Sequence, residues 1–194
     1  LKEKRKDVII CSKVGYIPGS RGTVFDVSYD HIISACNSSL KRLSTDYIDI
    51  YLLHSIPEKE QMDKSLYALK VLQKEGKIIN YGISVAHNLN RIPELRRNFS
   101  IIEGYYNLLL RNFENYKSKE VGFIAASPLS RGLLSGKNYT SVEEGDVRKK
   151  WAKGQIQHNW YIQQREKVLK FKKFADKWNI SIIKLAISYI LSHN

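Results

Sequence analysis

Lys13 and His54 are the two residues of this sequence that best suit acid–base chemistry, because each ends a short apolar run. A lysine and a histidine that face one pocket can tune a phenol so that it donates a proton at neutral pH. Reduction of a carbonyl group needs such a proton donor beside a source of hydride. These two residues therefore make carbonyl reduction one candidate chemistry, without excluding others.

Three further polar residues, Ser84, Asn107 and Ser127, also stand where an apolar run ends. The runs are short and mostly rich in β-branched residues, which is typical of strands buried on both faces of a parallel sheet. They cover residues 8–11, 47–53, 78–83, 100–106 and 121–126. We therefore expect the polar residues at their ends to lie along the carboxyl edge of one sheet.

Apolar residues at helical spacing occupy the segments between these runs. Helices are predicted from Ser28 to about residue 43 and over 66–75, 91–97 and 112–119. A long helix through residues 168–178 is predicted to end near residue 179, and a last one to begin at Ser181. Residues 14–23 and 137–158 are interpreted as loops. Strands that alternate with helices predict a parallel α/β sheet with right-handed crossovers.

Two α/β architectures compete for this pattern, a doubly wound open sheet and a (β/α)8 TIM barrel. A complete barrel needs about 250 residues, so a chain of this length with five strands would be an incomplete one. The open sheet would be complete, but no Gly-x-Gly-x-x-Gly follows any strand, which disfavours a dinucleotide-binding open sheet. Polar residues at all the strand ends favour the barrel, because its strand ends converge on one mouth.

Composition excludes several classes of protein. The chain has 32 Lys and Arg against 19 Asp and Glu, a formal charge of +13, and its 43% hydrophobic content does not suit a disordered chain. The basic excess is concentrated in residues 148–173, but no stacking aromatics or recognition motif accompany it, so we expect a solvated exterior and no nucleic-acid partner. No apolar stretch is long enough for a membrane span. Two cysteines are too few for a disulfide framework or a zinc site, which favours the cytoplasm and no metal.

Several motifs occur in an order that resembles the aldo-keto reductase family over nearly the whole chain. They are ICSKVG at 10–15, SLKRLSTDYIDIYLLH at 39–54, GKI at 76–78, YGIS at 81–84, YNLL at 106–109 and SPLSRGLLSGK at 127–137. The resemblance implies a (β/α)8 barrel, of which residues 1–194 would cover roughly strands 3 to 7 and the helix before strand 8. The chain is thus expected to be a single partial domain, truncated at both ends.

The resemblance also implies a reaction and a set of site residues. The implied reaction is reversible reduction of small-molecule aldehydes or ketones to alcohols with NADPH, or with NADH as the alternative. Lys13 and His54 match the catalytic lysine and histidine of the family. The nicotinamide amide would contact Ser84 and Glu103, and the cofactor's pyrophosphate would lie by a loop with three matching residues, Ser127, Leu129 and Arg131.

Other positions depart from the family pattern. Val85 stands where many members have Asn, Glu103 where Gln is usual, and Ala126 where many place a tyrosine on the nicotinamide ring. These departures motivate a second hypothesis, a non-catalytic NADP-binding or regulatory protein on the same barrel. The resemblance places the proton-donating tyrosine and its aspartate before Lys13, outside this chain, so residues 1–194 alone are expected to be inactive. The physiological substrate and the oligomeric state stay open.

Overall fold

The structure, a computed structural model, describes residues 2–19, 22–116, 119–137, 145–154 and 158–193. The chain forms two compact units. The first comprises residues 1–104 and 115–124, and the second comprises residues 105–114 and 125–194.

A five-stranded sheet with the order β1-β4-β5-β6-β7 is the main element of the first unit, and its last two strands end at the boundary with the second. The strands are β1 (Cys11–Val14), β4 (Ile48–Leu53), β5 (Ile78–Ala86), β6 (Ile101–Tyr105) and β7 (Gly122–Ala126). The pairs β1/β4, β4/β5 and β5/β6 are parallel. Strand order follows chain order, so the sheet lacks the reversal that defines a doubly wound fold. The predicted parallel α/β sheet is confirmed.

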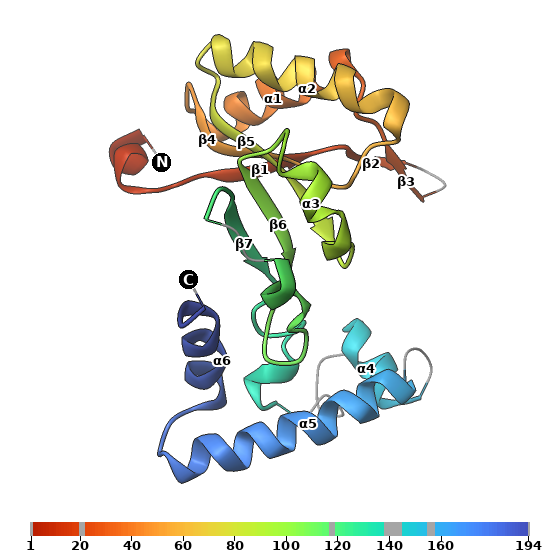
Figure 1. Cartoon of the computed structure of the whole chain (residues 1–194), viewed down its shortest axis with the longest axis vertical. Coiled ribbons are helices and arrows are strands. Elements are labelled where there is room, and N and C mark those ends of the chain that lie inside the picture. Colours follow the sequence, from red (N-terminus) through yellow and green to blue (C-terminus); the bar gives the residue numbers. More distant parts are fainter. Residues whose placement is uncertain (1, 20–21, 117–118, 138–144, 155–157, 194) are drawn as a thin grey trace. The chain divides into compact units, whose positions relative to one another are not determined.

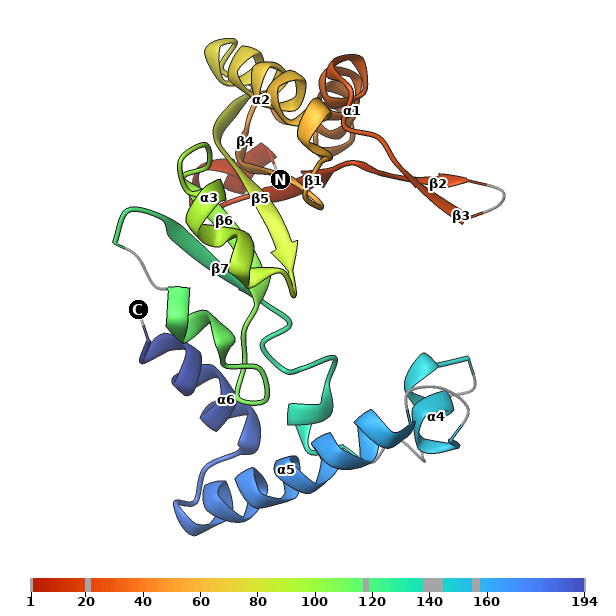
Figure 2. The same ribbon diagram turned by 45° about the vertical axis from the view of Figure 1, so that its right-hand side comes forward.

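Two long helices cover the first part of this sheet. Figures 1 and 2 show α1 (Tyr29–Leu43) and α2 (Lys59–Lys74) side by side, and they contact β1 and β5 respectively. Ser28 caps α1 as predicted, because its side chain accepts a hydrogen bond from the His31 backbone N–H at 3.4 Å. Apolar side chains of the two helices, such as Cys36 of α1 and Leu69 of α2, are fully buried.

Some predicted boundaries in this unit were wrong. The first strand begins at Cys11, because residues 2–7 form a 3-10 helix and the Ile9 side chain is 78% exposed. Strand β5 runs on to Ala86, so Ser84 lies inside it. The predicted helix at 91–97 is the 3-10 turn Leu89–Arg91 followed by α3 (Ile92–Leu95).

The predicted loop at 14–23 is instead an antiparallel hairpin of β2 (Tyr16–Gly19) and β3 (Gly22–Phe25), seen as an extended arm in Figure 2. Gly15 permits it, because its φ of 127° is one that residues with a side chain rarely adopt. A Cβ at Gly15 would also lie 2.5 Å from Phe25 Cε2. Gly15 therefore serves the link between β1 and this hairpin.

The second unit is mainly helical. It contains the 3-10 turn Leu133–Ser135, α4 (Val147–Ala152), α5 (His158–Lys177) and α6 (Ile182–Leu191), while the 3-10 helix Asn112–Tyr116 crosses the boundary. Ser181 caps α6 as predicted and accepts from the Lys184 backbone N–H at 3.1 Å. The predicted loop 137–158 contains α4, and parts of that loop lie outside the described residues.

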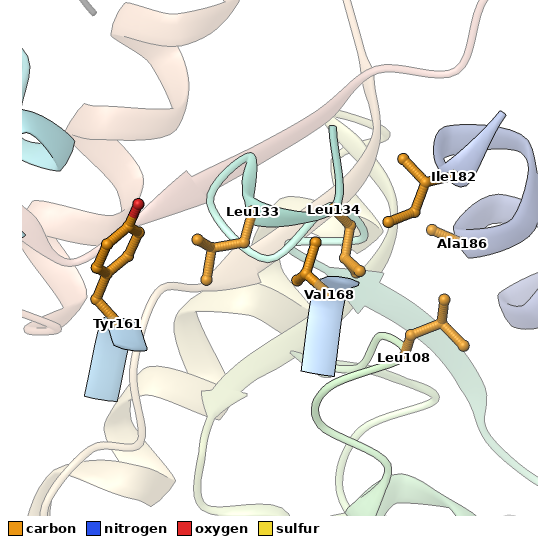
Figure 3. Close-up of a cluster of buried hydrophobic side chains, with 7 residues drawn as sticks. All are labelled: Leu108, Leu133, Leu134, Tyr161, Val168, Ile182 and Ala186. Carbon is orange, nitrogen blue, oxygen red and sulfur yellow. The ribbon is translucent and has the colours of Figure 1, made fainter. Parts of the chain in front are cut away.

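A cluster of buried apolar side chains joins the loop after β7 to α5 and α6 within this unit. Figure 3 shows its members, which are Leu108, Leu133, Leu134, Tyr161, Val168, Ile182 and Ala186. Burying a leucine or valine side chain contributes about 1.5–3 kcal/mol, so this cluster stabilises the unit. Across the described ranges, no helix is both long and apolar enough to cross a membrane.

Candidate functional site

Three of the predicted site residues form one polar network in the first unit. Lys13 Nζ on β1 lies 2.9 Å from Glu103 Oε2 on β6. Ser84 on β5 pairs in register with Glu103, and its Oγ donates a hydrogen bond to Glu103 Oε1 at 2.9 Å. The Glu103 carboxylate thus holds a lysine and a serine from different strands at once.

The Lys13–Glu103 contact also shows how the sheet is curved. Two strands, β4 and β5, separate β1 from β6 in the sheet order. Neighbouring strands lie about 4.8 Å apart, so in a flat sheet β1 and β6 would be roughly 14 Å apart. The long lysine and glutamate side chains reach across much of this gap, and a sheet that curls, as in a barrel, shortens it further, so the 2.9 Å contact fits a curled sheet.

The charges in this network are unequally shielded from water. The Glu103 side chain is 11% exposed, whereas the Lys13 side chain is 31% exposed. Transfer of a charge out of water is unfavourable unless it is paired and hydrogen-bonded. The carboxylate therefore depends on its two partners more than the ammonium group does.

His54 follows β4 directly, on the strand next to β1. Its backbone N–H donates to the Val14 carbonyl at 2.8 Å, and its ring lies 5.0 Å from the Tyr16 ring at an edge-to-face angle of 78°. Partial burial lowers the pKa of His54 below its ordinary value, the positive charge of Lys13 lowers it further, and Glu103 opposes both. The imidazole is therefore neutral at pH 7 and can act as a hydrogen-bond donor to an oxygen atom.

The loop after β7 carries the other predicted site residues and lies in the second unit. Ser127 and Arg131 have positive φ angles of 53° and 54°, a conformation that costs energy for residues with a side chain. Turn hydrogen bonds shape the loop, including one of 2.9 Å from the Gly132 N–H to the Leu129 carbonyl. Strained backbone of this kind is concentrated at ligand-binding loops.

Asn107, which the sequence marked as a strand-end polar residue, is used to hold this loop. Its side chain is fully buried, and its Nδ2 donates to the Ser127 carbonyl at 2.9 Å. Its Oδ1 accepts from the backbone N–H groups of Leu109 and Leu110. Since these bonds occupy the amide, Asn107 positions the loop backbone.

A second polar cluster, which the sequence analysis missed, lies within the second unit. Glu114 accepts hydrogen bonds from the hydroxyl groups of Tyr106 and Tyr189 and pairs with Arg111 Nε at 3.1 Å. The Tyr189 hydroxyl and the Arg111 side chain lower the pKa of Glu114 to about 2. Tyr189 lies 75 positions from Glu114, so local sequence carried no signal for this contact.

The structure thus joins Lys13, Ser84 and Glu103, and it places His54 directly after β4, the strand between β1 and β5. Tyr16 beside His54 was missed, because the hairpin that carries it was interpreted as a loop. Within the described residues, no group of three His, Cys, Asp or Glu side chains is placed to hold a metal ion.

Comparison with protein families gives one match over the whole chain. The model of the aldo/keto reductase family matches residues 1–194. The chain belongs to the aldo-keto reductase family. Two curated proteins to which it is similar are an uncharacterized oxidoreductase of Bacillus subtilis, 31% identical over 151 residues, and L-glyceraldehyde 3-phosphate reductase of Escherichia coli, 30% identical over 154 residues. The matches cover 74% and 72% of this chain but only 49% and 44% of those proteins, so the chain spans about half of their length.

Solved structures of aldo-keto reductases have the same fold. The holo form of aldo-keto reductase AKR11C1 from Bacillus halodurans matches with a TM-score of 0.64 and 34% identity, over 75% of this chain and 50% of that one. Glycerol dehydrogenase AKR11B4 from Gluconobacter oxydans matches with a TM-score of 0.78 and 25% identity, over all of this chain and 63% of that one. The fold is therefore part of a (β/α)8 barrel, as the strand-end argument predicted.

Proposed function

We propose that the protein containing this chain is an oxidoreductase that reduces a small aldehyde or ketone to an alcohol with NADPH, NADH being the alternative cofactor. The observation that carries the proposal is the network that Lys13, near the carboxyl end of β1, forms with Ser84 and Glu103, together with His54 at the carboxyl end of β4. Enzymes built on barrels of this kind hold their reactive groups at those ends.

The residues fit the amide group of a nicotinamide ring. Each oxygen of the Glu103 carboxylate accepts one bond, from Lys13 and Ser84 respectively, and a carboxylate can accept about four in all. Capacity is left for the N–H groups of a carboxamide, and the Ser84 oxygen can itself accept a bond. Ser84 and Glu103 would therefore hold this end of the cofactor, which supplies the hydride when bound.

Each remaining residue has a role that its position supports. The ammonium group of Lys13 would stabilise the ionised form of a neighbouring phenol and so help it to release a proton. The neutral His54 imidazole would donate a hydrogen bond to the substrate's carbonyl oxygen and orient it. From the family resemblance we also propose that Ser127, Leu129 and Arg131 contact the cofactor's pyrophosphate, where the Arg131 guanidinium would pair with a phosphate oxygen.

The proposal is tested by NADPH oxidation in the complete protein with glyceraldehyde as the carbonyl substrate. This substrate is chosen because two relatives carry the names L-glyceraldehyde 3-phosphate reductase and glycerol dehydrogenase. Lys13→Met and His54→Gln should each lower kcat by about 10²–10⁴-fold, the usual contribution of a positioned acid–base group. Lys70→Met, on the exposed face of α2, should leave kcat unchanged. Wild-type turnover in both site variants would refute the assignment.

A second candidate function is a non-catalytic NADP-binding or regulatory protein on the same barrel. It is supported by Glu103, which replaces a neutral glutamine of the family with a charge already engaged by Lys13. Titration of the complete protein with NADPH, followed by cofactor fluorescence, separates the two functions. Binding without turnover of any carbonyl substrate would favour the regulatory function.

Two further predictions from the sequence stay predictions. The first is that residues 1–194 alone turn over no substrate, and an assay of the purified chain under the same conditions tests it. The second is a cytoplasmic location, inferred from the cysteine content, which fractionation of the source cells tests.

A further inference from the structure

A pair of aromatic rings stands beside His54 and has no role in the chemistry described above. Tyr16 and Phe25 face each other across the hairpin of β2 and β3, with their ring centroids 5.1 Å apart. The Tyr16 ring in turn meets the His54 ring at 5.0 Å with an angle of 78° between the planes. Edge-to-face contact is the arrangement that the charge distributions of aromatic rings favour.

Backbone bonds on both sides determine where these rings lie. The His54 N–H donates to the Val14 carbonyl at 2.8 Å, and the Asp26 N–H donates to the Gly15 carbonyl at 2.7 Å. Gly15 links β1 to the hairpin, with a φ of 127° that residues with a side chain rarely adopt. Lys13, at the end of β1, is therefore followed within three residues by a ring that is directed at His54.

Tyr16 is only partly used by packing within the chain. The residue is 47% exposed, and His54 is also exposed. One edge of the Tyr16 ring therefore contacts the imidazole, and the rest is open to another molecule. A half-exposed aromatic ring next to a polar hydrogen-bonding group is typical of the wall of a small-molecule site.

We propose that Tyr16 is a positioning residue, which holds the His54 imidazole at the end of β4 and forms an apolar wall beside the carbonyl group that His54 binds. The proposal rests on the proposed function of His54. Removal of the Tyr16 ring would let the imidazole rotate away and expose it further, so that a bound carbonyl would lose its orientation. The phenol hydroxyl has no part in this role, so phenylalanine should replace tyrosine without loss.

The test is a nuclear magnetic resonance titration of the histidine rings in the complete protein, with the His54 signal assigned by its loss in His54→Gln. In Tyr16→Ala, the signal should lose its ring-current shift. The pKa of His54 should also rise towards its ordinary value, because the burial that lowers it is reduced. Lys13 and Glu103, the other charged groups that act on His54, are unchanged in this variant. Tyr16→Phe should keep both properties of the wild type.

Tyr67→Ala is the matched control, because Tyr67 is also exposed and also belongs to an aromatic pair, with Tyr29. It should change neither the chemical shift nor the titration of His54. In the reductase assay, Tyr16→Ala should lower kcat by about 10–100-fold, the cost of a misplaced reactive group, while Tyr16→Phe restores it. Circular dichroism of each variant checks that the fold is retained.

The result that would overturn the inference is a His54 signal in Tyr16→Ala with the wild-type shift and titration. A wild-type kcat in Tyr16→Ala, despite an altered His54 signal, would likewise overturn the positioning role. Failure of the proposed function is seen separately, as wild-type turnover in His54→Gln itself.

Discussion

The ion pair between Lys13 and Glu103 leads to an asymmetric prediction, in which removal of the lysine destabilises the protein more than neutralisation of the glutamate. Lys13→Met leaves a carboxylate that is 11% exposed without its cation. Glu103→Gln leaves an ammonium group that is 31% exposed and can turn towards water, and the new amide can still accept from Ser84.

The magnitudes follow from these exposures. Breaking a buried pair by removing one partner costs about 3–5 kcal/mol, and we take the lower end for Lys13→Met, about 3 kcal/mol, because the site is only partly shielded. For Glu103→Gln the cost is about 1.5 kcal/mol, the lower end for the loss of one hydrogen bond between charged groups. The double variant removes both charges, so it should be more stable than Lys13→Met alone.

Urea unfolding of the complete protein, followed by circular dichroism, measures the three free energies of unfolding. Glu94→Gln is the matched control, because its pair with Arg91 is exposed on both sides at 43% and 58%. It should cause no measurable loss, as is usual for surface pairs. Equal losses in Lys13→Met and Glu103→Gln, or a double variant less stable than Lys13→Met, would refute the reasoning.

Two further predictions concern stability. The pKa of Glu114, held at about 2 chiefly by the Tyr189 hydroxyl, is lower than its ordinary value of 4.5. Its stabilising contribution should therefore be complete above pH 4.5 and be lost as the pH falls towards 2. The free energies of unfolding of wild type and Glu114→Gln, measured across this pH range, should converge at its acid end. A constant difference between them would contradict this. Gly82→Ala should destabilise the sheet by about 3 kcal/mol or more, because its Cβ would lie 2.2 Å from the Ile101 carbonyl oxygen. Gly122→Ala, whose nearest contact is 3.6 Å, is the control, and equal melting temperatures in the two variants would argue against this packing.

Much of the fold was predictable because its signals are local. Ser28 and Ser181 cap helices through bonds to residues three positions away, so their pattern is visible in sequence. Strand β4 matched the predicted run closely, because its residues are almost all apolar and it is paired on both sides, with β1 and β5. The hairpin of β2 and β3 was missed, because a few residues with three glycines resemble an ordinary loop.

Part of the site was predictable for a similar reason. Lys13 and His54 stand at the ends of apolar runs, and a parallel sheet places such residues along one edge. Glu103 lies inside its strand with no local sign of a role, and only its match to a family position marked it.

The sequence by itself determined the five strands of the main sheet and its long helices, which strand ends carry polar groups, and the family to which the chain belongs. Tertiary structure alone decided that Lys13 meets Glu103 and that Tyr16 meets His54. The first contact depends on how strands separated by two others approach each other, and the second depends on the backbone conformation at Gly15 and the pairing of the hairpin. Neither quantity is a property of neighbouring residues, so no local pattern records it.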